Sequence, residues 1–104
     1  MAVSRQVKEG RQKQGTDEAI YYKLTTTPWG STPTSTAAAT YDITGGGRTD
    51  VTSTVMSGST SVTDDIITLP KLSTLTAGHL YRVEVKFTVS SNIFECFFEV
   101  EAEN

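Results

Sequence analysis

The stretch that decides the fold is Leu80-Tyr-Arg-Val-Glu-Val-Lys-Phe-Thr-Val89, which continues after Ser90-Ser91-Asn92 as Ile93-Phe-Glu-Cys-Phe-Phe-Glu-Val-Glu-Ala102. Apolar and polar residues alternate through both halves, and this period of two is typical of a β-strand that buries one face. We therefore expect two long strands joined by a hairpin turn. The side chains expected in the core are Tyr81, Val83, Val85, Phe87, Phe94, Cys96, Phe98 and Val100.

The charged residues on the opposite side predict the register of this hairpin. If Ser90-Ser91 forms the turn, the numbers of facing residues add up to 181, which sets Lys86 opposite Glu95 and Arg82 opposite Glu99. A slip of two residues would instead set glutamates against each other. Because facing opposite charges stabilise a strand pair and like charges destabilise it, we expect the first register. Two serines are an uncommon pair for a two-residue turn, so a longer loop is left open.

Upstream of the hairpin, short candidate strands alternate with turn signals. The chain holds 18 threonines and 10 serines among its 104 residues, which favours β-branched strands and polar turns over helices. Turn signals stand at residues 28–33, which include two prolines, at Gly45-Gly46-Gly47 and at Ser57-Gly58-Ser59. A chain of this length suits a single core. The pattern predicts one all-β domain, an antiparallel β-sandwich.

The residues that lead into the hairpin are Leu72-Ser-Thr-Leu75-Thr-Ala-Gly78-His-Leu-Tyr81. This order of leucine, glycine and tyrosine resembles the tyrosine corner of immunoglobulin-like and fibronectin type III sandwiches, in which a tyrosine at the start of the sixth strand bonds back to the preceding loop. The resemblance implies an immunoglobulin-like sandwich of about seven strands over residues 18–104. It also implies that the hydroxyl of Tyr81 binds the backbone between Leu75 and Gly78.

The start of the chain differs in charge from the rest. Residues 1–14 carry a net charge of +3 and residues 15–104 carry −6, which together make the −3 of the whole chain. The basic residues of the first segment are Arg5, Lys8, Arg11 and Lys13, against Glu9. We assign residues 1–17 to a basic N-terminal arm. It either remains a solvated tail or crosses to an acidic face of a neighbouring copy, in which case it becomes ordered only on assembly.

Five stretches carry a second resemblance. They are Gln14-Gly-Thr-Asp-Glu-Ala-Ile-Tyr, Leu24-Thr-Thr-Thr-Pro-Trp-Gly-Ser-Thr-Pro-Thr, Thr49-Asp-Val-Thr-Ser-Thr-Val, Asp64-Asp-Ile-Ile-Thr-Leu-Pro and Leu75-Thr-Ala-Gly-His-Leu-Tyr-Arg-Val-Glu-Val-Lys-Phe. With them, the chain from Gly15 to Ala102 resembles small structural proteins of bacteriophages and prophages. The resemblance implies a non-enzymatic virion component at the capsid, the neck or the tail, assembled in the host cytoplasm. Its partners would be other virion proteins and copies of itself.

Residue types that often carry chemistry are scarce, and we expect no catalytic residue, cofactor or metal. His79 could be half of a hydrolytic pair, but no acidic partner stands near it in the sequence. Asp64-Asp65 lacks the spacing of a calcium loop, and Gly45-Gly-Gly-Arg48 lacks the ending of a phosphate loop. Cys96, the single cysteine, is expected to be an inert core residue. No apolar run is long enough for a membrane helix, and the N-terminus lacks a secretory signal, so synthesis is expected inside the cell.

Two surface regions are candidate contacts. Ile93 and Phe97 alternate onto the same side as Glu95, Glu99 and Glu101, and two large apolar residues on an acidic face either contact a partner or are scattered surface residues. Trp29 stands between two prolines and is either a plug over one end of the sandwich or an interface anchor. The alternative function is a carbohydrate- or host-surface-binding module with Trp29, Tyr21 and Tyr41 as stacking residues. Nucleic acid and membranes are not expected partners.

Overall fold

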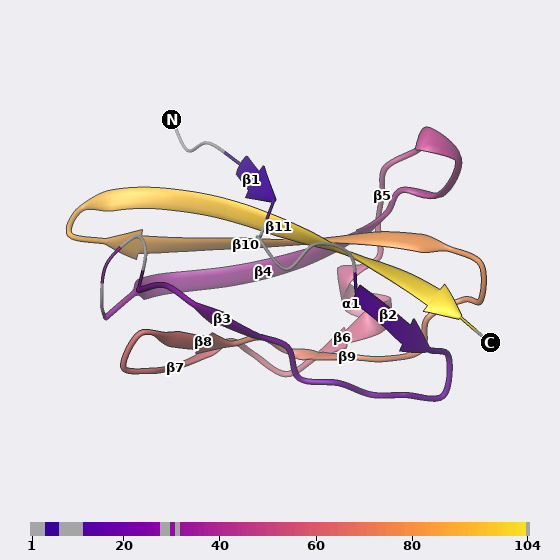
Figure 1. The fold of residues 1–104 in the computed structure, drawn as a ribbon, viewed down its shortest axis with the longest axis horizontal. Coiled ribbons are helices and arrows are strands. Elements are labelled where there is room, and N and C mark those ends of the chain that lie inside the picture. Colours follow the sequence, from indigo (N-terminus) through magenta and orange to yellow (C-terminus); the bar gives the residue numbers. More distant parts are fainter. Residues whose placement is uncertain (1–3, 7–11, 28–29, 31, 104) are drawn as a thin grey trace.

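Two layers of β-sheet pack against each other (Figure 1). The computed structural model describes residues 4–6, 12–27, 30 and 32–103, and for residues 4–6 it describes the backbone. The larger layer is a six-stranded sheet in the order β1-β11-β10-β4-β5, with β2 also paired to β11. Its strands are β1 (Ser4–Gln6), β2 (Gln12–Gly15), β4 (Thr34–Asp42), β5 (Thr49–Asp50), β10 (Leu80–Val89) and β11 (Asn92–Glu103).

The second layer consists of shorter strands. One sheet has the order β3-β8-β7, and the other pairs β6 with β9. These strands are β3 (Lys23–Thr25), β6 (Met56–Ser57), β7 (Ser61–Thr63), β8 (Ile66–Thr68) and β9 (Lys71–Leu72). Helical structure in the described residues is limited to α1 (Thr52–Val55) and the 3-10 turn η1 (Thr44–Gly46). The prediction of an all-β chain is confirmed, and several strands of two to four residues bring the total above the seven or so expected.

The hairpin of β10 and β11 has the predicted register. Lys86 faces Glu95 and Arg82 faces Glu99, and every facing pair of residue numbers adds up to 181. The turn consists of Ser90 and Ser91, whose φ angles are 49° and 70°. Two successive positive φ angles are the pattern of a two-residue type I′ turn, which matches the twist of the strands it joins. The longer loop that was left open is therefore not formed, although neither serine favours this conformation.

The core lies between the two layers. Of the eight side chains predicted to be buried, all except Phe94 are at most 7% exposed. Phe94 is half-buried and packs with its ring centroid 5.7 Å from that of Phe87, near the end of the hairpin that projects beyond the second layer in Figure 1. The second layer contributes Leu24, Ile67, Leu69 and Leu72, together with Leu75 from the following loop.

The tyrosine corner predicted at Tyr81 is present. The hydroxyl of Tyr81 accepts a hydrogen bond of 2.9 Å from the backbone N–H of Thr76, which lies in the predicted range between Leu75 and Gly78. Tyr81 and Leu75 are buried, and Gly78 has a φ of 81°, in the left-handed region that glycine adopts without strain. This hydrogen bond therefore ties the loop before β10 to the start of that strand.

Tyr81→Phe removes this hydroxyl and keeps the packing of the ring. We expect it to lower the free energy of unfolding by about 0.5–1.5 kcal/mol, because the N–H of Thr76 loses its acceptor. The measurement is equilibrium unfolding in urea. Tyr21→Phe is the control, since Tyr21 is 57% exposed and should leave the midpoint unchanged. An unchanged midpoint and slope for Tyr81→Phe would show that the corner bond does not stabilise the fold.

The described parts of the N-terminal arm differ from the expectation that it orders only on assembly. β1 pairs with residues 95–97 of β11 and β2 pairs with residues 100–103, both in parallel, so these segments extend the chain's own sheet. The boundary assigned after residue 17 therefore leaves β2, which is a strand of the larger sheet, on the side of the arm. The physical reason is that the β10–β11 hairpin pairs only one edge of β11. The backbone N–H and C=O groups of the other edge can bind any segment that forms backbone hydrogen bonds with them.

Gln14 anchors β2 between the layers. Its side chain is fully buried, and its Nε2 donates to the carbonyls of Leu72, at 2.8 Å, and of Glu18, at 3.0 Å. Its Oε1 accepts a hydrogen bond of 2.9 Å from the hydroxyl of Tyr22, whose ring packs on Phe98. The amide is thus bonded at both ends, as a buried polar group requires.

Candidate interaction surface

The outer face of the six-stranded sheet holds most of the residues predicted to make contacts. We use this name for the side chains of β11, β10, β4 and β2 that alternate with the buried ones and point away from the second layer. Its members are Lys13, Tyr41, Arg82, Glu84, Lys86, Ile93, Glu95, Phe97, Glu99 and Glu101. The hairpin register brings together Ile93, Phe97 and the three glutamates of the sequence prediction.

The glutamates of the outer face do not form an acidic patch. Glu95, Glu99 and Glu101 each have a basic neighbour in the strand register of the same chain, and the pairs are Lys86–Glu95, Arg82–Glu99 and Lys13–Glu101. The last pair comes from the arm itself, because β2 lies beside β11. The charge that was expected to attract a neighbour's arm is therefore largely balanced within the chain. The expectation of an acidic face that awaits a partner is corrected by this pairing.

A row of stacked and paired charges crosses the outer face. The guanidinium of Arg82 lies 3.7 Å from the ring centroid of Phe97, and its Nε lies 2.9 Å from Oε2 of Glu84. The same oxygen lies 3.1 Å from Nη2 of Arg48, whose guanidinium is 4.1 Å from the ring centroid of Tyr41. Cation–π contacts of this kind hold both arginines flat on the sheet. Phe97 is half-buried and less available to a partner than its sequence pattern suggested.

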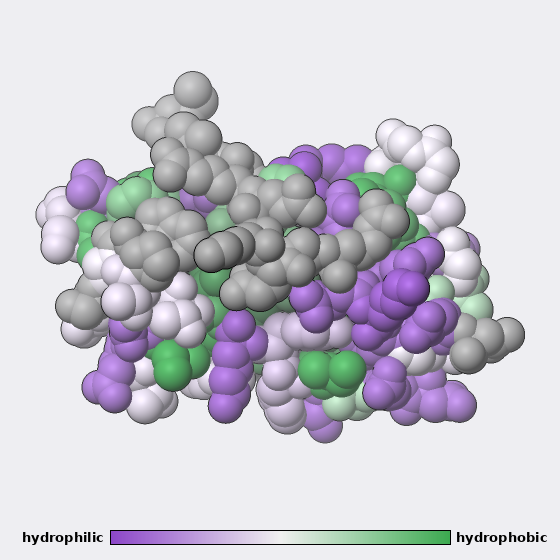
Figure 2. Space-filling view, in the orientation of Figure 1, coloured by the Kyte–Doolittle hydropathy of each residue, from purple (hydrophilic) through white to green (hydrophobic). Residues whose placement is uncertain are grey.

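Ile93 remains open on the outer face. It is 52% exposed and lies beside the turn between β10 and β11. Among the described residues, the other large apolar side chains that are at least a third exposed are those of Tyr21, Val62 and Ile66, all on the side of the second layer. In Figure 2 the hydrophobic residues on the side in view form separate small patches among polar ones. Of the two apolar contact residues predicted on β11, Ile93 is therefore the more accessible.

The remaining predicted contact residues are placed in part. Lys13 is exposed in β2. Arg5 lies in β1, where its backbone pairs with that of Cys96 in β11. Lys8, Arg11 and Trp29 lie outside the described residues.

Of the three aromatic residues of the alternative carbohydrate-binding function, the structure describes Tyr21 and Tyr41, and these two do not lie on one surface. Tyr41 belongs to β4 in the larger layer, and one face of its ring is covered by Arg48. Tyr21 precedes β3 in the second layer, with the ammonium of Lys71 at 5.4 Å from its ring centroid. A stacking platform for a sugar needs open ring faces on one surface, and these two rings lie on different layers.

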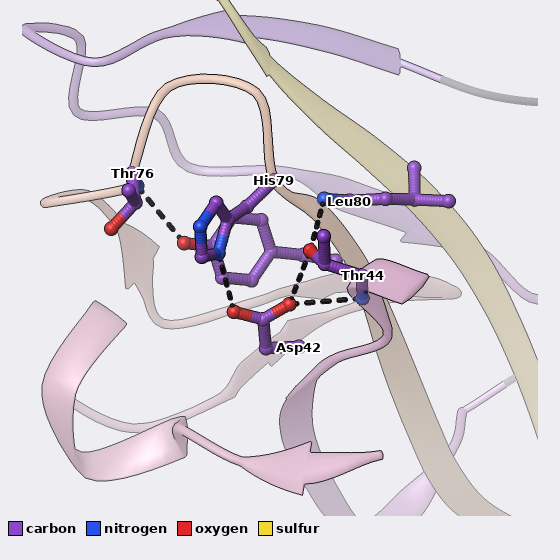
Figure 3. A network of polar contacts seen from close by, with 6 residues as sticks. Asp42, Thr44, Thr76, His79 and Leu80 are labelled. Carbon is purple, nitrogen blue, oxygen red and sulfur yellow. Dashed lines mark hydrogen bonds and ion pairs between the residues drawn. The ribbon is translucent and has the colours of Figure 1, made fainter. Parts of the chain in front are cut away.

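His79 has an acidic partner that sequence reasoning missed. Figure 3 shows Asp42, at the end of β4, between η1 and the corner loop. Its Oδ2 lies 2.7 Å from Nδ1 of His79, and its Oδ1 accepts hydrogen bonds from the N–H of Thr44, at 3.0 Å, and from its hydroxyl, at 2.6 Å. The two partners are 37 residues apart, and the pairing of β4 with β10 in which Asp42 faces Tyr81 brings them together.

This pair holds two turns together. An imidazole bound to a carboxylate at Nδ1 can act as a base at Nε2, but nucleophilic catalysis also needs a free hydroxyl or thiol at that nitrogen. The hydroxyl of Thr44 donates to Asp42 and accepts from the N–H of Leu80 (Figure 3). The hydroxyl of Tyr81 accepts from the N–H of Thr76. The network therefore fastens η1 to the tyrosine corner.

The Asp42 network predicts a loss of stability in acid. Burial raises the pKa of Asp42, but the hydrogen bonds from Thr44 and His79 outweigh it, so the pKa lies below its ordinary value of 3.8. A carboxylate whose pKa is lowered by folding stabilises the protein above its unfolded pKa, and this contribution is lost as the pH falls through the folded pKa. We expect Asp42→Asn to cost about 0.5–1.5 kcal/mol at pH 7 and clearly less near pH 3. Urea unfolding at both pH values checks this, and an equal cost at both would contradict it.

Cys96 and Asp65, two other residues considered for chemistry, have contacts that fit a structural role. Cys96 is 1% exposed, and burial raises the pKa of its thiol to about 11, which fits an unreactive core residue. Asp65 accepts hydrogen bonds from Thr26 through its carbonyl and from Thr27 through its carboxylate. Within the described residues, no three His, Cys, Asp or Glu side chains gather as a metal site would require. None of the described helices is long and apolar enough to cross a membrane.

Comparison of the chain with family models, with curated proteins and with solved structures gives no match. The function proposed below therefore rests on the residues of the chain and on the geometry of its surface.

Proposed function

We propose that this chain is a non-enzymatic structural component of a bacteriophage virion that acts through protein contacts in a symmetric assembly. It would be a capsid decoration, neck or tail-associated protein, assembled in the cytoplasm of the bacterial host. The resemblance of residues 15–102 to small virion proteins motivates the proposal. The observation that carries it is the exposure of Ile93, a large apolar side chain that is 52% exposed on an otherwise charge-balanced face.

The proposal includes an immunoglobulin-like topology for the sandwich. The pairing β11-β10-β4-β5 matches the strands G, F, C and C′ of that fold, and β3-β8-β7 matches B, E and D. The corner bond of Tyr81 supports the match, because it falls at the start of β10, where such folds carry their corner tyrosine. Sandwiches of this kind present rigid sheet faces and loops to partners, which suits a structural role.

Ile93 is a suitable centre for a contact. Burying an exposed isoleucine against a partner stabilises a complex, and the charged residues around it can form a polar rim. Many identical weak contacts in a ring or shell add up to a stable assembly.

Ile93→Glu is expected to leave the isolated protein folded and to reduce its incorporation into particles about tenfold or more, because a charge then replaces the apolar contact in every copy. The measurement is the amount of this protein in purified particles from complemented infections, quantified by mass spectrometry. Ile66→Glu is the matched control, since Ile66 is a 36% exposed isoleucine on the second layer.

Absence of the wild-type protein from purified particles would overturn the virion proposal. Normal incorporation of Ile93→Glu with loss of Ile66→Glu would move the contact to the second layer. The alternative, a carbohydrate- or host-surface-binding module, would instead be favoured by saturable binding of the isolated protein to host polysaccharide that Tyr21→Ala abolishes.

A further inference from the structure

We propose that the edge of β11 is an acceptor for β2 of a second copy of this chain, so that neighbouring copies in an assembly exchange their N-terminal strands. The proposal rests on the proposed function and names the partner and the contact that it requires. The occupant is residues 12–15 of the neighbour, because this edge already binds that segment within one chain.

The bonds that hold β2 are available on every copy. Gln12, Lys13, Gln14 and Gly15 pair in register with residues 100–103 of β11 through backbone groups. Specificity comes from Gln14, whose amide fits between the carbonyl of Leu72 and the hydroxyl of Tyr22. Lys13 adds a charge beside Glu101. A neighbour's β2 would find the same ladder, the same buried partners for Gln14 and the same glutamate, so exchange keeps these contacts.

The connection that would open is short and lies at the surface. After β2, residues 16–19 form a turn in which the N–H of Glu18 donates to the carbonyl of Gly15 at 3.1 Å, and Asp17, Glu18 and Ala19 are exposed. Opening this turn gives up that bond, the bond from the N–H of Gly15 to Oε1 of Glu18 at 2.6 Å, and the bond from Gln14 to the carbonyl of Glu18. A dilute monomer therefore keeps its own strand. Exchange becomes accessible where neighbours are held at high local concentration, because the assembly has then already met the entropic cost of association.

The length of the turn sets the geometry of the partner. Gly15 and Ile20 are five residue steps apart, which span at most about 18 Å when the chain is extended. The β11 edge of the receiving copy must therefore begin within that distance of the donor's Ile20, which is itself fixed to Leu72 by two backbone hydrogen bonds. The exchange thus fits a ring or a twofold pair in which the C-terminal ends of the β11 strands lie close together.

The experiment uses two full-length variants mixed in equal amounts, both with Cys96→Ala to remove the native thiol. One carries Lys13→Cys and the other Glu101→Cys. Residues adjacent in a strand register have the Cα separation that a disulfide needs, and neither variant can form this disulfide within its own chain. After incubation at millimolar concentration and mild oxidation with diamide, mass spectrometry counts the heterodimers. The matched control replaces the second variant by Glu95→Cys, on the same face of β11 but six residues out of register.

Exchange predicts about tenfold more disulfide between positions 13 and 101 than between positions 13 and 95, and the excess should grow with protein concentration. The same pair of variants incorporated into particles should cross-link to a similar excess. Equal, low yields for both pairs in solution and in particles would overturn the exchange. A protein that cross-links in register but is absent from particles would leave the exchange standing and remove the virion function, so the two failures are distinguishable.

Discussion

Phe87→Ala is expected to lower the free energy of unfolding by about 3–5 kcal/mol, the largest effect of any single truncation proposed for this chain. Phe87 is fully buried in β10, between the two layers, and its ring packs on that of Phe94. Removing the ring loses the transfer free energy of the side chain and leaves a cavity that rigid sheets close only in part. A small domain has roughly 5–15 kcal/mol of stability in total, so the variant would be close to unfolding at room temperature.

Equilibrium unfolding in urea, followed by the fluorescence of the single tryptophan and by circular dichroism, measures this loss. Phe87→Leu is the matched control, because it keeps most of the apolar volume and should cost clearly less than the alanine variant. If alanine and leucine at this position unfold at the same urea concentration as the wild type, Phe87 does not belong to the core that the alternation of β10 predicts.

Gln14→Ala is expected to cost about 1–3 kcal/mol, a large effect for one polar side chain near the N-terminus. The substitution leaves the hydroxyl of Tyr22 without its acceptor, in a part of the structure where Gln14 is fully buried. It also removes one of the two donors to the carbonyl of Leu72, which keeps its hydrogen bond from the N–H of Ile20. A buried polar group without a partner costs its full desolvation penalty, whereas a solvent-exposed one regains bonds from water. The loss should therefore far exceed that of an ordinary surface substitution.

Two further variants test this reading of Gln14. Lys13→Ala is the control, since Lys13 is the exposed neighbour in the same strand, and its effect should stay within about 0.5 kcal/mol. Gln14→Glu keeps an acceptor for Tyr22 but removes the donor for Leu72 and buries a charge, so it should be at least as unstable as the alanine variant at pH 7. Urea midpoints for Gln14→Ala equal to those for Lys13→Ala would show that β2 does not dock between the layers.

The members of the candidate surface and two of its three charge pairs were predictable, and the third pair was not. Ile93, Phe97 and the three glutamates share one face because the alternation of β11 requires it. Their charge balance depends on Lys86 and Arg82, which the hairpin register supplies, and on Lys13, which is 88 residues away from Glu101 in the sequence. Reading the segment around Lys13 as an arm that reaches outward missed the free edge of β11 in its own chain.

Local pattern determined the hairpin, its register and the tyrosine corner of this protein, because each depends on residues close in sequence whose alternation, charge and turn spacing leave one favourable arrangement. Only the tertiary structure decided where β1 and β2 pair, why Gln14 is buried and that Asp42 meets His79. The segments around Gln14 and Asp42 are short and polar, and their apolar residues follow no strong period. Their positions therefore depend on hydrogen bonds to strands that are distant in the sequence, and those bonds can form only once the two layers have packed.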